Sequence, residues 1–175
     1  MAKFNVIRAG RKQDGYMDKL IKNMFLDSRA FLKRGYGICA DSPDIILCGF
    51  NSVRAPLNKP SLIKCHYLEL SIGYDEGKDA ALMTADILGR FLLGIGFQSY
   101  ISAIDSGTGY LIAVVINAVS FSEPQMFHDN NYQYLMILDY LNRTTPLKWS
   151  PLSANATFFD PKVGEGNYEH GLEAY

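Results

Sequence analysis

The sequence predicts an α+β domain built on a central, mainly antiparallel sheet with helices packed on one face. The first observation is size, because 175 residues with 48% hydrophobic content are enough for one core and one domain. The second is the order strand, helix, strand, Gly-rich turn and strand over residues 65–121. The third is the stretch 110–121, which is almost wholly apolar and rich in Val and Ile, as buried central strands are. We expect the domain to span residues 1–143 and residues 144–175 to form an extended acidic tail.

The chain before this central block predicts one strand and one basic helix. Residues 3–9 alternate well enough for a short first strand. A helical period over residues 14–34 predicts an amphipathic helix, with Asp14 as its N-cap and Gly35 at its end. Residues 37–64 are punctuated by prolines, so we expect an irregular excursion that contains one short helix or strand.

The central block and the helix that follows it give the clearest elements. Residues 65–72 predict a strand, 80–93 a helix with an acidic first turn, and 97–107 and 110–121 two more strands. Residues 127–142 predict a further amphipathic helix, capped by Asp129 or Asn130. The remaining residues hold three prolines and no sustained period, which is why we expect a tail there.

Basic residues concentrate near the N-terminus, although the whole chain has a formal net charge of -1. That balance excludes a protein that coats nucleic acid through charge alone. The predicted basic helix can nevertheless show several cations to a phosphate backbone, and Tyr36 beside it suits stacking on an exposed base. The alternative is a solvated helix face, with tyrosine as an ordinary half-buried residue. The candidate DNA-binding residues are Lys19, Lys22, Arg29, Lys33, Arg34 and Tyr36.

The cysteines and the apolar runs indicate a cytoplasmic protein with no membrane partner. The three cysteines are odd in number and form no CxxC pair, so we expect reduced core residues. No signal-peptide core is present at the N-terminus, and the longest apolar run, residues 111–116, is too short to cross a bilayer.

Three segments carry a resemblance to a known family. They are His-Tyr-Leu-Glu-Leu-Ser at 66–71, Ser-Ala-Ile-Asp at 102–105 and Leu-Ile-Ala-Val-Val-Ile-Asn-Ala-Val at 111–119, followed by the helix that ends at Asn142. In order and spacing they resemble relaxases of the mobilisation-protein kind, which belong to the HUH endonuclease superfamily. The resemblance implies an HUH fold related to the ferredoxin-like topology. It also implies single-stranded or hairpin DNA of a plasmid or other mobile element as partner, together with other proteins of conjugation, transfer or replication.

The chemistry of that family depends on residues that this chain has replaced. In the family three histidines hold a divalent metal, and a tyrosine attacks the phosphorus of the nicked strand. The resemblance aligns the three histidine positions with Asp105, Leu111 and Ala113, and two of these side chains have no lone pair to offer a metal. The tyrosine position falls near Phe25, which has no nucleophilic oxygen. We therefore expect a pseudoenzyme that binds DNA without cofactor and without nicking it.

Two alternatives stay open. One is a DNA nickase with a rebuilt site that uses Mg²⁺ or Mn²⁺, in which Asp105 acts with Tyr16 or Tyr36 and with His128 or Asp129 as further ligands. His128 and Asp129 can also be interpreted without a metal, as residues that only cap the following helix. The other alternative is a protein-interaction module with no nucleic-acid role, in which the acidic tail or a sheet edge binds a partner.

Overall fold

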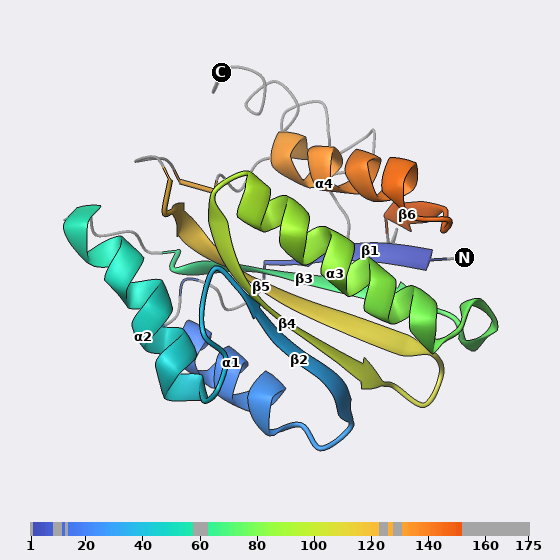
Figure 1. The fold of residues 1–175 in the computed structure, drawn as a ribbon, viewed down its shortest axis with the longest axis horizontal. Coiled ribbons are helices and arrows are strands. Elements are labelled where there is room, and N and C mark those ends of the chain that lie inside the picture. Colours follow the sequence, from blue (N-terminus) through green and yellow to red (C-terminus); the bar gives the residue numbers. More distant parts are fainter. Residues whose placement is uncertain are drawn as a thin grey trace.

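A computed structural model describes residues 2–8, 12, 14–57, 63–122, 126–127 and 131–151. Its architecture is α+β, which confirms the predicted class, and it contains six strands and four α-helices in this part of the chain (Figure 1). In chain order the elements are β1 (Ala2–Ile7), α1 (Tyr16–Leu26), β2 (Ala30–Tyr36), α2 (Pro43–Arg54), β3 (Cys65–Ile72), α3 (Lys78–Gly94), β4 (Phe97–Asp105), β5 (Tyr110–Ser120), α4 (Asn131–Thr144) and β6 (Trp149–Pro151). Short 3₁₀ turns, η1 (Ala55–Leu57) and η2 (Tyr74–Glu76), follow α2 and β3.

The strands form one sheet in the order β2-β4-β5-β3-β1-β6. All neighbouring pairs are antiparallel except β1 with β6, so the prediction of a mainly antiparallel sheet is confirmed. β5 lies between β4 and β3, and its residues from Ile112 onward are buried. The apolar stretch is therefore the central strand that the sequence predicts.

Helices cover both faces of the sheet, which corrects the prediction that they pack on one face. α3 and α4 lie on one side, and α1 and α2 on the other (Figure 1). The reason lies in β5, whose side chains from Leu111 to Ile116 are apolar on both faces: Ile112 and Val114 point to α3, while Ala113 and Val115 point to α1 and α2. A strand that is apolar on both sides must be covered on both sides.

The predicted helix over residues 14–34 is wrong in its second half. α1 ends at Leu26, and Ala30–Tyr36 form β2 at the edge of the sheet. Asp27 ends the helix, because its extended backbone breaks the helical path and its Oδ1 accepts a hydrogen bond from the backbone N of Arg29 at 2.9 Å. Asp14 is not the cap, since Gly15 occupies that position in a left-handed conformation without a side-chain cap.

Two further segments are more regular than the sequence predicts. Within residues 37–64, α2 forms a 12-residue helix whose N-cap is Ser42, with Oγ accepting from the backbone N of Ile45. At the start of the predicted tail, β6 pairs in parallel with β1 and so belongs to the sheet. Residues 152–175, the rest of the predicted tail, lie outside the described part, as do Asp129 and Asn130, the predicted caps of α4.

Candidate functional site

The face of the sheet under α1 and α2 is closed at one end and open at the other. At the closed end, Met17, Ile21 and Phe50 of the two helices pack in one buried cluster with Tyr100 and Val115 of the sheet. At the open end, beside the turn between β4 and β5, the sheet's own side chains meet solvent. Ile104 and Leu111 are half-buried there, and Lys3 and Ser71 are exposed.

The open end consists of two rows of side chains that run across the strands. Residues directly opposite each other in an antiparallel pair point to the same face, so the pairing fixes each row. The first row is Lys3, Ser71, Leu111 and Ile104, on β1, β3, β5 and β4. The second row, two residues along each strand, is Asn5, Glu69, Ala113 and Ser102, of which Asn5, Ala113 and Ser102 are buried, so the first row is the one that meets solvent.

Asp105 is not part of these rows, although the sequence makes it a candidate metal ligand beside Leu111 and Ala113. It follows Ile104 on β4 and pairs with Tyr110, so its side chain points to the opposite face. Its carboxylate accepts hydrogen bonds from the Tyr74 hydroxyl and from the backbone N of Gly107, and the Tyr74 bond lowers the pKa of Asp105. The residue of β4 that shares a face with Leu111 and Ala113 is Ile104.

No metal centre is present in the described part of the chain. No group of three His, Cys, Asp or Glu side chains lies close enough there to hold an ion. His128 and Asp129, the other candidate ligands, lie outside the described residues. The side chains of Ile104, Leu111 and Ala113 carry no donor atoms, so the three positions on the open end do not fit a divalent metal.

The candidate catalytic tyrosines lie on different faces of the sheet. Tyr16 is in the first turn of α1, half-buried against the cluster on the α1/α2 face. Tyr36 lies on the α3 face, where burial raises its pKa and its hydroxyl donates to Oδ1 of Asp86 at 3.1 Å. Tyr36 sits opposite Ser99, six residues along β4 from Asp105 or roughly 20 Å away. Tyr16, Tyr36 and Asp105 are therefore not brought together, and the buried ring of Tyr36 is not placed to stack on a base.

The candidate DNA-binding cations do not share one helix. Lys19 and Lys22 are exposed on α1, and neither side chain has an ion-pair partner within the described ranges. Arg29 lies in the following turn, where it pairs with Asp27 at 2.7 Å and helps to lower the pKa of that carboxyl to about 2. Lys33 and Arg34 lie on β2.

The two cations of β2 point to opposite faces of the sheet. The ammonium of Lys33 lies 5.3 Å from the centre of the Phe25 ring of α1, on the α1/α2 side. Arg34 reaches the α3 side, where its Nη1 lies 3.1 Å from Asp86 Oδ1. Lys19, Lys22 and Lys33 therefore remain on the side of the open end, while Arg34 is engaged elsewhere.

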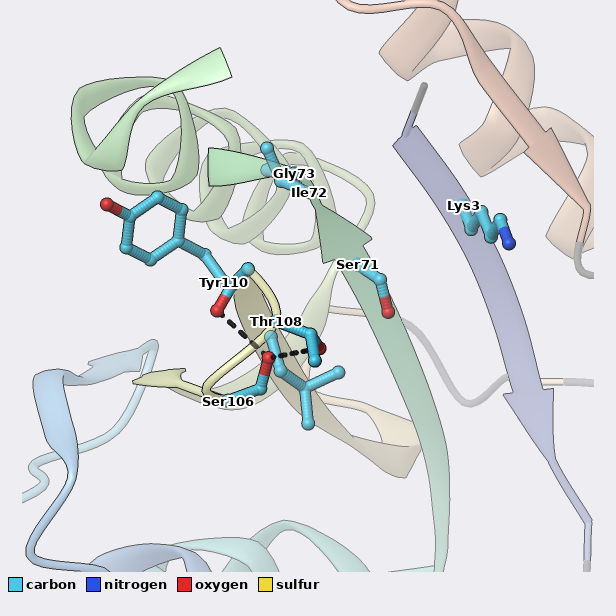
Figure 2. Close-up of a pocket in the computed structure, with 9 residues that line it drawn as sticks. Lys3, Ser71, Ile72, Gly73, Ser106, Thr108 and Tyr110 are labelled. Carbon is cyan, nitrogen blue, oxygen red and sulfur yellow. Dashed lines mark hydrogen bonds between the residues drawn. The ribbon is translucent and has the colours of Figure 1, made fainter. Parts of the chain in front are cut away.

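A shallow pocket of about 340 Å³ lies at the open end, between the ends of β1 and β3 and the turn from β4 to β5 (Figure 2). Its described lining includes Lys3, Ser71 and Leu111 of the first row, and Ser106 and Thr108 of the turn. The hydroxyl of Ser106 donates to the Gly109 carbonyl at 2.9 Å. Gly109 has φ 156, and a Cβ there would overlap the carbonyl oxygen of Ile72, so the turn closes on β3 only with glycine.

Several buried polar atoms on the same face have no hydrogen-bond partner among the described residues. They are Asn5 Oδ1, Tyr100 Oη and Ser102 Oγ. Buried polar groups are normally paired with protein or water, so unpaired ones mark places where a ligand or solvent completes the bonding. By contrast, Glu69 is engaged, because the Tyr67 hydroxyl donates to its Oε1 at 2.8 Å.

Sequence reasoning missed Lys3, Ser71 and Ile104, which the cross-strand pairing places in one row. The alternation of β1 and β3 indicates that Lys3 and Ser71 point away from the apolar side chains of their strands, but not that the two residues are neighbours. In the described part of the chain no helix is long and apolar enough to cross a membrane. Comparisons of the chain with protein-family models, with curated proteins and with solved structures gave no match.

Proposed function

We propose that this chain is a relaxase-like DNA-binding protein of a plasmid or other mobile element, and that it assists transfer or replication without nicking DNA. One observation carries the proposal. Leu111 and Ala113 share one face of β5, at two of the three positions where the resemblance to HUH endonucleases implies metal-binding histidines, and Ile104 is their neighbour on β4. The third position, Asp105, points to the opposite face, so the three positions that the resemblance implies cannot hold one metal, which supports a protein without nicking chemistry.

The surroundings of the open end suit a nucleic-acid strand. Lys19 and Lys22 on α1 and Lys33 on β2 offer cations on this side of the sheet. Cations that are not already paired gain most from a phosphate, because counterion release drives this kind of binding. Arg29 and Arg34 already pair with carboxylates, so we assign them a smaller contribution to phosphate binding than the three lysines.

The pairing also separates this proposal from that of a nickase. A rebuilt active site needs a nucleophile and a metal ligand within reach of one phosphorus atom. Asp105 and Tyr36 are about 20 Å apart along β4, and Tyr16 is on the other face from both. We therefore propose binding without cleavage. Nicking of supercoiled plasmid in Mg²⁺ or Mn²⁺ that is lost in Asp105→Ala is the result that would favour the nickase instead.

The experiment that tests the proposal is a salt titration of oligonucleotide binding. Fluorescence anisotropy of a labelled single strand, from 50 to 300 mM NaCl, should give an affinity that falls steeply with salt. The Lys19→Gln/Lys22→Gln variant should lower the slope of log K against log salt by about 1.4, or about 0.7 per contact. The matched control removes the same charge from the other face, with Lys78→Gln/Arg90→Gln on α3, and should leave the slope unchanged.

Two results would contradict the proposed DNA-binding function. If the wild-type protein does not bind a single strand or a hairpin at 50 mM salt, the proposal fails and the protein-interaction module remains. If the α3 control lowers the slope as much as the α1 variant, the lysines of α1 are not specific phosphate contacts, and binding does not depend on one face of the sheet.

A further inference from the structure

We propose that the pocket at the open end binds one phosphate group of the DNA strand, and that the Lys3 ammonium supplies the positive charge for it. The inference rests on the proposed function, which it deepens by naming the ligand group and the residues that hold it. It follows from the charge, the free hydrogen-bonding groups and the position of the pocket.

Lys3 and Ser71 are the two free polar groups of the pocket. They pair directly across β1 and β3 and are both exposed. Within the ranges that the structure describes, neither side chain has a hydrogen-bonding or ion-pairing partner. An ammonium and a hydroxyl side by side can both donate to the oxygens of one phosphate group.

The lining of the pocket carries a positive charge, because Lys3 is the charged residue among the described residues that line it. The nearest carboxylate on this face, Glu69, accepts from the hydroxyl of Tyr67, which precedes it on β3, whereas Ser71 follows it. Asp105, at the end of β4, points to the other face and is held by Tyr74. The Asp75 carboxylate lies beside Gly73, another lining residue. None of these carboxylates forms an ion pair with Lys3.

The turn between β4 and β5 forms the other wall of the pocket. Figure 2 shows the hydroxyls of Ser106 and Thr108 side by side, 3.4 Å apart, in the turn that closes the pocket. Ser106 donates to the Gly109 carbonyl, so Thr108 is the donor in its bond to Ser106. The turn thus forms a polar wall, while Ser71 offers the hydroxyl donor on the other side of the space that Lys3 adjoins.

Lys3 lies in the same row of side chains as Leu111 and Ile104. It is two strands away from Leu111 in the first row, which is about 10 Å between backbones. A lysine stem extends along the surface while its ammonium stays in solvent, so the charge can lie over Ser71, between the backbones of Lys3 and Leu111. Leu111 gives the pocket an apolar surface that suits a sugar or base next to the phosphate.

The test measures how substitutions in this pocket change the slope of log K against log salt. Lys3→Gln should lower the slope of log K against log salt by about 0.7 and weaken binding several-fold at 100 mM salt. Lys64→Gln is the matched control, because Lys64 is an exposed lysine just before β3, at the end opposite Ser71. A second pair of variants, Ser71→Asp and Ser71→Asn, places a carboxylate or a neutral amide beside Lys3. The aspartate should weaken binding at least tenfold and the asparagine less than threefold.

The source of the phosphate is tested with two further ligands. A strand with neutral methylphosphonate linkages should bind equally well to wild type and Lys3→Gln, because it offers no charged oxygen. Inorganic phosphate at 10 mM should compete weakly with the strand, and to the same extent as an equal ionic strength of chloride. Selective competition by phosphate would overturn the assignment to a strand and indicate a small-anion site.

The outcomes separate this inference from the proposed function. If wild type binds the strand but Lys3→Gln behaves as Lys64→Gln does, the phosphate assignment is overturned and the proposed function stands. If wild type does not bind at all, both fall together. Thermal unfolding of every variant should match wild type, because Lys3 and Ser71 are exposed and make no contacts that folding needs.

Discussion

The two faces of the sheet are covered very differently. On the α3/α4 face, Leu88 and Leu92 of α3 are completely buried, with Ile101 and Ile112 of the sheet in the same cluster. On the α1/α2 face, the cluster ends at Ala113, and the row that begins with Leu111 is left to solvent. One face is therefore buried along its length, whereas the other combines a buried cluster with a row of side chains that meets solvent.

Helix length explains much of the difference. α1 has 11 residues and α2 has 12, so each is about 17–18 Å long, whereas the 11 residues of β5 extend over about 37 Å. Two short helices gathered at one end cannot cover that length. α3 has 17 residues, about 26 Å, and Gly89 lets it approach the Tyr36 ring more closely than any side chain would permit.

The largest effect that we predict tests whether the three aliphatic positions share one face. Replacing Ile104, Leu111 and Ala113 with histidine should create a site for Zn²⁺ with Kd on the order of 1 µM, or about 8 kcal/mol, measured by titration calorimetry. The matched control carries Asp105→His in place of Ile104→His, which puts the third imidazole on the opposite face. Equal affinity in the two variants would contradict the pairing of β4 with β5.

The next prediction concerns the closed end of the α1/α2 face. Cys65 is buried there, and burial raises the pKa of its thiol to about 12. A raised pKa keeps the thiol protonated at pH 8, so Cys65 should react with a maleimide on the order of 10³ times more slowly than an ordinary thiol. Cys39 and Cys48 are exposed and serve as internal controls. Mass spectrometry that finds Cys65 modified first would show that this end is open as well.

The third prediction compares one chemical change on the two faces. Leu88→Ala on α3 removes a completely buried side chain and should lower the free energy of unfolding by about 3 kcal/mol. Leu111→Ala removes a half-buried one and should cost less than about 1 kcal/mol. Urea unfolding followed by circular dichroism measures both. Similar losses for the two variants would mean that the open end is packed in solution.

The smallest effect is expected where α2 is attached to the sheet. The buried Nδ2 of Asn117 donates to the Phe50 carbonyl at 3.1 Å and to Gln98 Oε1 at 3.0 Å. Asn117→Ala leaves both acceptors without this donor and should lower the free energy of unfolding by about 2 kcal/mol. Gln133→Ala is a suitable comparison, because Gln133 is a buried amide on α4, outside this network. An unchanged urea midpoint for Asn117→Ala would argue against a fixed α2.

The sequence predicted the central block well because its signals are local and long. β3, α3, β4 and β5 appear within a few residues of their expected bounds, since alternation and helical period persist over at least eight residues in each. β2 was missed because Ala30, Phe31 and Leu32 continue an apolar helical spacing, which hid the Asp27 turn. The sequence predicted only one short helix or strand where α2 has 12 residues, although Ser42 and Pro43 form an ordinary helix start.

The candidate site was harder to predict because it depends on pairing between strands. One residue along a strand changes the face, so the choice between Asp105 and Ile104 required the register of β4 with β5. Lys3 and Ser71 are 68 positions apart in the chain and become neighbours only through the pairing of β1 with β3. That Leu111 and Ala113 cannot bind a metal was readable from the sequence, because their side chains have no donor atoms wherever they lie.

The most direct test of the account is to see which face a DNA strand contacts. Methyl NMR of Ile- and Leu-labelled protein, titrated with a short oligothymidine, reports both faces in one experiment. We predict shifts for Ile104 and Leu111 at the open end, with Leu88 and Ile87 of α3 unchanged. Shifts confined to the α3 methyls, or no shifts at a strand concentration that saturates the anisotropy signal, would contradict binding of the strand at the open end.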